Sequence, residues 1–200
     1  VAELRGLIEQ HNANLPPRAS NRHYHIRHPL LMDMAIHHFD LMRYVLGQEP
    51  VSVYCQAWNP PWSNFTEPPA AVATIVFDGG TVVDYRGSWV STGAQTTWDG
   101  EWQIECAGGV IAWTGRDDNS LGADAVTLRP RGKRPSRVPL PALTYWDRAG
   151  SLAEFVDAVR GGREPLTSGR DNLASAALMF AAMQSAETGQ PINTLHPLSV

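Results

Sequence analysis

Residues 71–90, AVATIVFDGGTVVDYRGSWV, decide the fold class of this chain. Apolar and polar residues alternate on both sides of Asp78-Gly79-Gly80, a pattern typical of a tight turn between two antiparallel strands. Similar runs of period two occupy residues 51–55, 102–106 and 110–113, and Gly108-Gly109 separates the last two. We therefore predict one open, largely antiparallel sheet within residues 51–128.

Helical patterns flank this block of strands. The pattern of residues 30–46 has an apolar stripe at helical spacing and predicts a long helix that ends at Gly47. Two further helices are predicted over residues 147–160 and 168–188, and each is followed by glycine. The basic stretch 129–141 lacks interleaved aromatic residues, which favours a solvated loop. A helix, a run of strands and then helices predict an α+β fold, with helices on one face of the sheet and the other face free.

The start of the chain predicts a boundary between structural units. Leu4, Leu7 and Ile8 have helical spacing without a cap, which predicts a helix over residues 1–9 and a chain cut from a longer one. Residues 11–21 contain Pro16-Pro17 and are typical of a connector. We predict that residues 1–20 are a helix and linker left from a missing domain, and that residues 21–200 form one domain.

Composition excludes several classes of protein. A net charge of −4 and a pI near 6.0 give no reason to expect nucleic acid as a partner. The sequence has neither an apolar run long enough to span a bilayer nor a secretion signal, so we expect no membrane partner and a cytoplasmic location. Cys55 and Cys106 are too few for a disulfide framework and are expected to be buried and reduced.

Candidate reactive groups concentrate on the helix predicted over residues 30–46. At 100° per residue, Asp33, His37, Asp40 and Tyr44 share a sector of about 60° beside the apolar stripe. A carboxylate four residues before an imidazole can orient the ring and stabilise its protonated form, as a general base requires. The same pair is also compatible with a purely structural role that pins a neighbouring strand.

A metal site is a further alternative, because His23, His25 and His28 precede His37 and His38. Their spacing matches neither a helical His-Glu-x-x-His arrangement nor a Cys/His knuckle. We therefore predict no metal site and retain a metal-dependent hydrolase only as a lesser alternative.

The pattern Asp33-x-Ala35-x-His37-x-x-Asp40, followed by LMRYVLG at 41–47, resembles a signature of the Gfo/Idh/MocA oxidoreductases. The resemblance extends along the chain in the expected order, through FDGGTVVDYRGSW at 77–89, WQIECAGGVI at 102–111, FVDAVRGGREPLTSGRD at 155–171 and SAETGQPI at 185–192. It therefore covers nearly the whole chain from about residue 21.

The resemblance implies a carboxy-terminal domain of the glyceraldehyde-3-phosphate-dehydrogenase-like type, which shapes a substrate pocket and pairs subunits through its free sheet face. It implies that His37 is the catalytic acid/base and that Asp33 orients it or binds a substrate hydroxyl. We expect Asp40, His38 and Tyr44 to bind the substrate, a sugar or cyclitol. The parent enzyme would use NAD or NADP. This chain has no Gly-x-Gly-x-x-Gly turn and no Glu-Lys-Pro segment, so no cofactor and no activity are expected for the chain alone.

Two features qualify this interpretation. Where the family often has glycines before the aspartate, this sequence has Arg27-His28-Pro29-Leu30-Leu31, which leaves the substrate's identity open. The rival function is a non-catalytic dimerisation module whose exposed sheet face is rich in Trp89, Trp98, Trp102 and Trp113.

Overall fold

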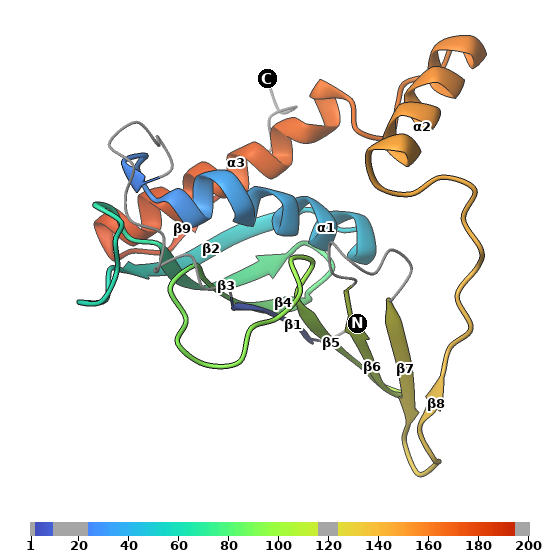
Figure 1. The fold of residues 1–200 in the computed structure, drawn as a ribbon, viewed down its shortest axis with the longest axis horizontal. Coiled ribbons are helices and arrows are strands. Elements are labelled where there is room, and N and C mark those ends of the chain that lie inside the picture. Colours follow the sequence, from blue (N-terminus) through green and yellow to red (C-terminus); the bar gives the residue numbers. More distant parts are fainter. Residues whose placement is uncertain (1–2, 10–23, 116–123, 195–200) are drawn as a thin grey trace.

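The structure, a computed structural model, describes residues 3–9, 24–115 and 124–194. Within these residues, nine strands form one sheet in the order β8-β7-β6-β5-β1-β4-β3-β2-β9. Helices α1 and α3 lie across one face of the sheet (Figure 1). The predicted α+β class, with an open sheet covered on one side, is confirmed.

The predicted hairpins are present. Antiparallel pairing joins β2 (Pro50–Trp58), β3 (Ala70–Phe77) and β4 (Val82–Ser88) in turn, with the Asp78-Gly79-Gly80 turn between β3 and β4. A second antiparallel series runs through β5 (Glu101–Cys106), β6 (Gly109–Thr114), β7 (Ala125–Pro130) and β8 (Ser136–Arg137). The predicted solvated loop is exposed over residues 131–137, although the short strand β8 within it was not predicted.

The helix predicted over residues 1–9 is wrong. Residues Glu3–Glu9 form strand β1, which pairs in parallel with β4 and antiparallel with β5 and so joins the two series of strands. Pairing along both edges satisfies the backbone donors and acceptors of this segment, whereas an isolated helix of that length is marginal. The predicted connector at 11–21 lies outside the described residues, so the boundary at residue 20 stays a prediction.

The predicted helices end where the glycines indicated. A π-helical segment, η2 (Leu30–Ala35), continues into α1 (Ile36–Leu46), and the N–H of left-handed Gly47 donates to the Arg43 carbonyl at 2.8 Å. Helix α3 (Gly169–Thr188) begins after Ser168, whose hydroxyl accepts from the Asp171 N–H. Helix α2 (Asp147–Gly161) extends away from the sheet, with Ala158 its only buried residue (Figure 1).

The core fills the space between the sheet and helices α1 and α3. Trp102 and Trp113 stack there with ring centroids 6.0 Å apart, and Trp89 is also buried. Gly6 makes this packing possible, because a Cβ at that position would lie 2.7 Å from the Trp102 ring. The prediction that these tryptophans crowd the free sheet face is therefore wrong, since they point toward the helices.

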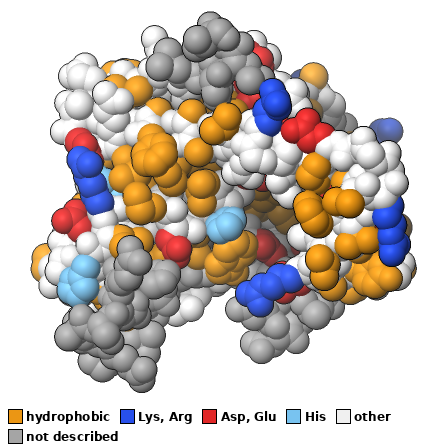
Figure 2. Space-filling view, turned by 90° about the horizontal axis from the view of Figure 1, so that it is seen from above, with side chains coloured by type: hydrophobic (Ala, Val, Ile, Leu, Met, Phe, Trp, Pro, Cys, Tyr) orange, Lys and Arg blue, Asp and Glu red, His pale blue; other side chains and the backbone are white. Residues whose placement is uncertain are grey.

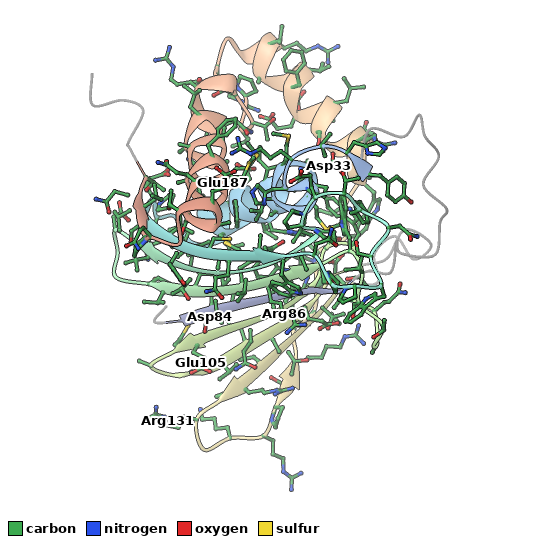
Figure 3. All side chains as sticks on the ribbon, turned by 90° about the vertical axis from the view of Figure 1, so that its left-hand side faces the viewer. Asp33, Asp84, Arg86, Glu105, Arg131 and Glu187 are labelled. Atoms are coloured by element: carbon green, nitrogen blue, oxygen red, sulfur yellow. The ribbon has the colours of Figure 1, made fainter. Side chains whose placement is uncertain are left out.

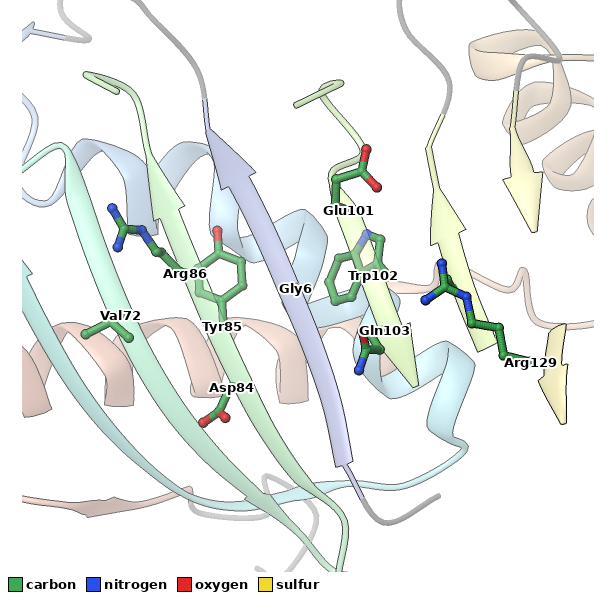
Figure 4. A pocket seen from close by; sticks show the side chains of 10 residues that line it. Gly6, Val72, Asp84, Tyr85, Arg86, Glu101, Trp102, Gln103 and Arg129 are labelled. Atoms are coloured by element: carbon green, nitrogen blue, oxygen red, sulfur yellow. The ribbon is translucent and has the colours of Figure 1, made fainter. Parts of the chain in front are cut away.

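The opposite face of the sheet is mixed in character. Tyr54, Trp58, Val72 and Val82 are exposed on it, and Asp84, Arg86 and Glu105 also point away from the helices (Figure 3). A hollow of about 440 Å³ opens over β1, between β4 and β5 (Figure 4). The helical side also leaves apolar side chains exposed, together with histidines (Figure 2).

Both cysteines are free thiols. Cys55 is buried and Cys106 is half-buried, and burial raises the pKa of Cys55 to about 12.

Within the described residues, none of the helices combines the length and the apolarity needed to cross a bilayer.

Candidate functional site

The helix formed by η2 and α1 presents the candidate pair. Its inner side is anchored by buried Leu30, Met34 and Phe39, while Asp33 and His37 are exposed. Trp89 strengthens the anchor by donating its indole N–H to the Met34 sulfur at 3.0 Å. The anchored helix thus holds both predicted catalytic side chains at the surface, with Asp33 on the helical side of the sheet (Figure 3).

Trp98 is the neighbour of His37 that the sequence did not identify. The indole comes from the segment between β4 and β5, and its ring centroid lies 5.4 Å from that of His37, at an interplanar angle of 56°. Trp98 remains 40% exposed. An imidazole and an indole therefore stand side by side at the surface, and nothing in the local pattern of residues 91–100 indicated this pairing.

His38 lies in the opposite environment, 1% exposed. Its Nε2 donates to the Trp98 carbonyl at 3.3 Å, so Nδ1 of the neutral ring accepts from the Tyr85 hydroxyl, also at 3.3 Å. Burial lowers the pKa of His38 to about 4, although the Trp98 hydrogen bond acts in the opposite direction. Both ring nitrogens are engaged inside the protein, so the observed contacts of His38 are structural, and its predicted contact with substrate stays a prediction.

Asp40 also has partners within the protein. One carboxylate oxygen accepts from the Ser175 hydroxyl at 2.6 Å, and Arg43 lies 3.5 Å from the same oxygen. Arg43 is itself buried and pairs with Glu49 at 2.7 Å and with Asp171 at 3.3 Å. This network joins α1 to α3 and gives Asp40 structural contacts, and its predicted contact with substrate stays a prediction.

Tyr44 is 75% exposed on the same helix. It follows His37 by seven residues, or about 10 Å along the helix axis. Its predicted contact with substrate stays a prediction, since this distance lets only a large ligand touch both side chains.

The remaining histidines that the structure describes, His25 and His28, do not converge on the site. His25 is exposed, whereas the Nε2 of buried His28 lies 3.2 Å from Glu187 of α3, and His23 is outside the described residues. No group of three His, Cys, Asp or Glu side chains within the described ranges could hold a metal ion. His28 also has a φ of 46°, a conformation that favours glycine, at the point where this sequence departs from the family's glycine run.

Comparisons with known proteins identify the family of this chain. The profile of the GFO/IDH/MocA C-terminal domain matches residues 3–112. Inositol 2-dehydrogenase of Rhizobium meliloti is 27% identical over 174 residues, which cover 78% of this chain and 47% of that protein. The chain spans about half the length of the curated relatives it matches.

Solved structures share the fold. A putative NADPH-dependent oxidoreductase from Desulfitobacterium hafniense superposes with a TM-score of 0.83 at 15% identity, over 97% of this chain and 57% of that one. Levoglucosan dehydrogenase in complex with NADH gives a TM-score of 0.77 at 17% identity, over 97% of this chain and 58% of that one. The matched profile covers more than half of the chain, and the chain belongs to the GFO/IDH/MocA family through its C-terminal domain.

Proposed function

We propose that this chain is the substrate-binding domain of an NAD(P)-dependent oxidoreductase that acts on a hydroxyl of a sugar, cyclitol or related polyol. The observation that carries the proposal is the exposed pair Asp33 and His37, one turn apart on a helix whose other side is buried. Relatives that include an inositol dehydrogenase and a levoglucosan dehydrogenase support the substrate class.

Within this proposal, His37 handles the hydroxyl proton. Its exposed imidazole accepts the proton of the substrate hydroxyl during oxidation and returns it during reduction. Asp33, on the same exposed side of the helix, orients the ring or binds a neighbouring hydroxyl. Both residues reach solvent directly, so a substrate can approach them without any rearrangement of the core.

NAD(P) does not fit the described residues of this chain. The helices there begin after Pro29, Trp146 and Ser168, and no glycine-rich turn leads from a strand into any of them. NAD(P) would supply the hydride acceptor, and we assign its binding to a separate nucleotide-binding domain. This chain alone is expected neither to bind NADH nor to oxidise polyols.

The test replaces His37 by alanine in the protein that carries both domains, with polyol oxidation followed by NADH formation. We expect kcat to fall about 10²- to 10⁴-fold with a smaller change in KM, because a positioned general base acts mainly in the transition state. His25→Ala is the matched control, since His25 is also exposed, and should leave kcat unchanged. Wild-type turnover in His37→Ala would refute the assignment.

We also propose that the chain pairs with a second copy of itself through the free face of the sheet. Tyr54, Val72 and Val82 supply exposed apolar area there, and Asp84 and Arg86 supply charges of both signs that a symmetric partner can match. A self-complementary surface of this kind is compatible with catalysis on the helical side.

A further inference from the structure

The turn at residues 97–100 is fixed by three successive carbonyl groups. The Trp98 carbonyl accepts from His38 Nε2 at 3.3 Å, and the Asp99 carbonyl accepts from the Trp102 indole N–H at 2.6 Å. The Gly100 carbonyl accepts from the Gly115 N–H at 3.0 Å. Two of these donors are side chains of the buried core, so the turn is held by the core itself.

This fixation extends through the sheet. His38 is anchored by fully buried Tyr85 of β4, and Trp102 of β5 stacks on Trp113 of β6. Gly100 adopts a left-handed φ of 84°, and its N–H donates to the Thr97 carbonyl, which closes the turn. The backbone that carries Trp98 is therefore held by hydrogen bonds to the core and to its own turn, although its indole reaches the surface.

Contacts within the protein cover only part of the Trp98 indole. It packs against the rings of His37 and His38, with centroids 5.4 and 5.7 Å away, and still leaves 40% of the residue exposed. An exposed tryptophan on a rigid turn beside a reactive imidazole presents an apolar surface that pays no ordering cost when a ligand binds.

We propose that the Trp98 indole is one wall of the substrate site and selects ring-shaped polyols by packing against their C–H face, while His37 meets a hydroxyl. This inference rests on the proposed function and adds a specificity-determining residue to it. A cyclic polyol with equatorial hydroxyls carries axial C–H groups on the faces of its ring, and an indole can cover such a face. An open-chain polyol must first be ordered into such a face, at an entropic cost. His38 is then a positioning residue that acts through the Trp98 carbonyl.

The experiment uses the 200-residue chain and nuclear magnetic resonance of the Trp98 indole N–H and the His37 ring protons, titrated with myo-inositol, methyl β-glucopyranoside and open-chain sorbitol. We expect saturable shifts at both groups with the two cyclic compounds and weaker binding of sorbitol. Trp98→Ala should weaken binding of the cyclic compounds about tenfold, the effect of exposing about 50 to 60 Å² of apolar surface. Trp98→Phe should retain most of the affinity.

Trp58→Ala is the matched control, because Trp58 is a 37% exposed tryptophan on the far face of the sheet and should leave binding unchanged. Shifts at His37 without shifts at Trp98, or cyclic binding that survives Trp98→Ala, would overturn this inference and leave the proposed function standing. Absence of shifts at both groups would overturn both proposals for this chain. Equal affinity for sorbitol and the cyclic compounds would overturn the selectivity.

Discussion

His37 and His38 are adjacent in the sequence and occupy opposite surroundings. The first is exposed beside the Trp98 indole, and the second is buried between Tyr85 and the Trp98 carbonyl. Because successive residues on a helix are turned by about 100°, one imidazole can serve chemistry while the next holds the loop that borders it. Alanine at either position should therefore affect function: His37→Ala removes the reacting imidazole, and His38→Ala removes the support of the loop beside it. Measurements of stability distinguish these two causes.

The buried imidazole predicts a distinct pH dependence of stability. The pKa of His38 is about 4 in the folded chain and about 6.5 in the unfolded one, so the unfolded state binds the extra proton between these values. Stability is therefore full above pH 6.5 and falls as the pH drops toward 4, by up to about 3 kcal/mol from this group.

Urea unfolding of the wild type and His38→Phe, measured at pH 7.5 and at pH 4.5, tests this expectation. The loss of free energy of unfolding at the lower pH should be smaller in His38→Phe, because that variant lacks the titrating ring. His25→Ala, which removes an exposed histidine, should keep the wild-type difference. An equal loss in His38→Phe and the wild type would show that His38 does not carry the effect.

At the scale of elements, the sequence predicted best where the pattern and its end signal are both local. Period-two runs joined by Asp78-Gly79-Gly80 located β3 and β4, and Gly47 and Gly189 marked the ends of α1 and α3. Asp33 and His37 were likewise correctly placed at the surface by helical periodicity. Features that the sequence did not predict depend on distant contacts, such as the burial of His38 and the pairing of Asp40 with Ser175.

Strand β1 is the clearest case of a structure that depends on distant contacts and not on local sequence. Its short pattern fits a helix, and only β4 and β5, both more than 70 residues away in the chain, make it a strand. The role of Gly6 likewise cannot be predicted from the local sequence, because it depends on the Trp102 ring that lies over this glycine.

Gly6→Ala tests this packing directly. The added methyl group would lie 2.7 Å from the Trp102 ring, so either the ring or the strand must shift, and we expect a loss of about 1–3 kcal/mol in the free energy of unfolding. Gly108→Ala is the matched control, since a Cβ there meets no atom within 4 Å. Urea denaturation of both variants gives the comparison, and equal stability of the two would contradict the close approach at Gly6.

For the whole molecule, the two proposals assign different tasks to the two faces of the sheet. The helical side holds the candidate site and leaves apolar side chains exposed on α2, where Leu152, Phe155 and Val159 are each more than half exposed. The free side carries the mixed surface around Val72 and Arg86 and the hollow over β1 (Figure 4). Because the two surfaces lie on opposite sides of the sheet, the proposed substrate chemistry and the proposed subunit pairing would not interfere with each other.

Self-association through the free face is the prediction at this scale. Sedimentation velocity at high micromolar concentration should find a dimer or larger assembly, because exposed apolar residues on an open sheet gain from burial against a second copy. Val72→Lys should dissociate it, since the new cation would lie beside Arg86, its cross-strand neighbour on the same face. Leu152→Lys, the same kind of change on α2, should leave the assembly intact. A wild-type chain that stays monomeric, or a Val72→Lys chain that stays assembled while correctly folded, would rule out this surface.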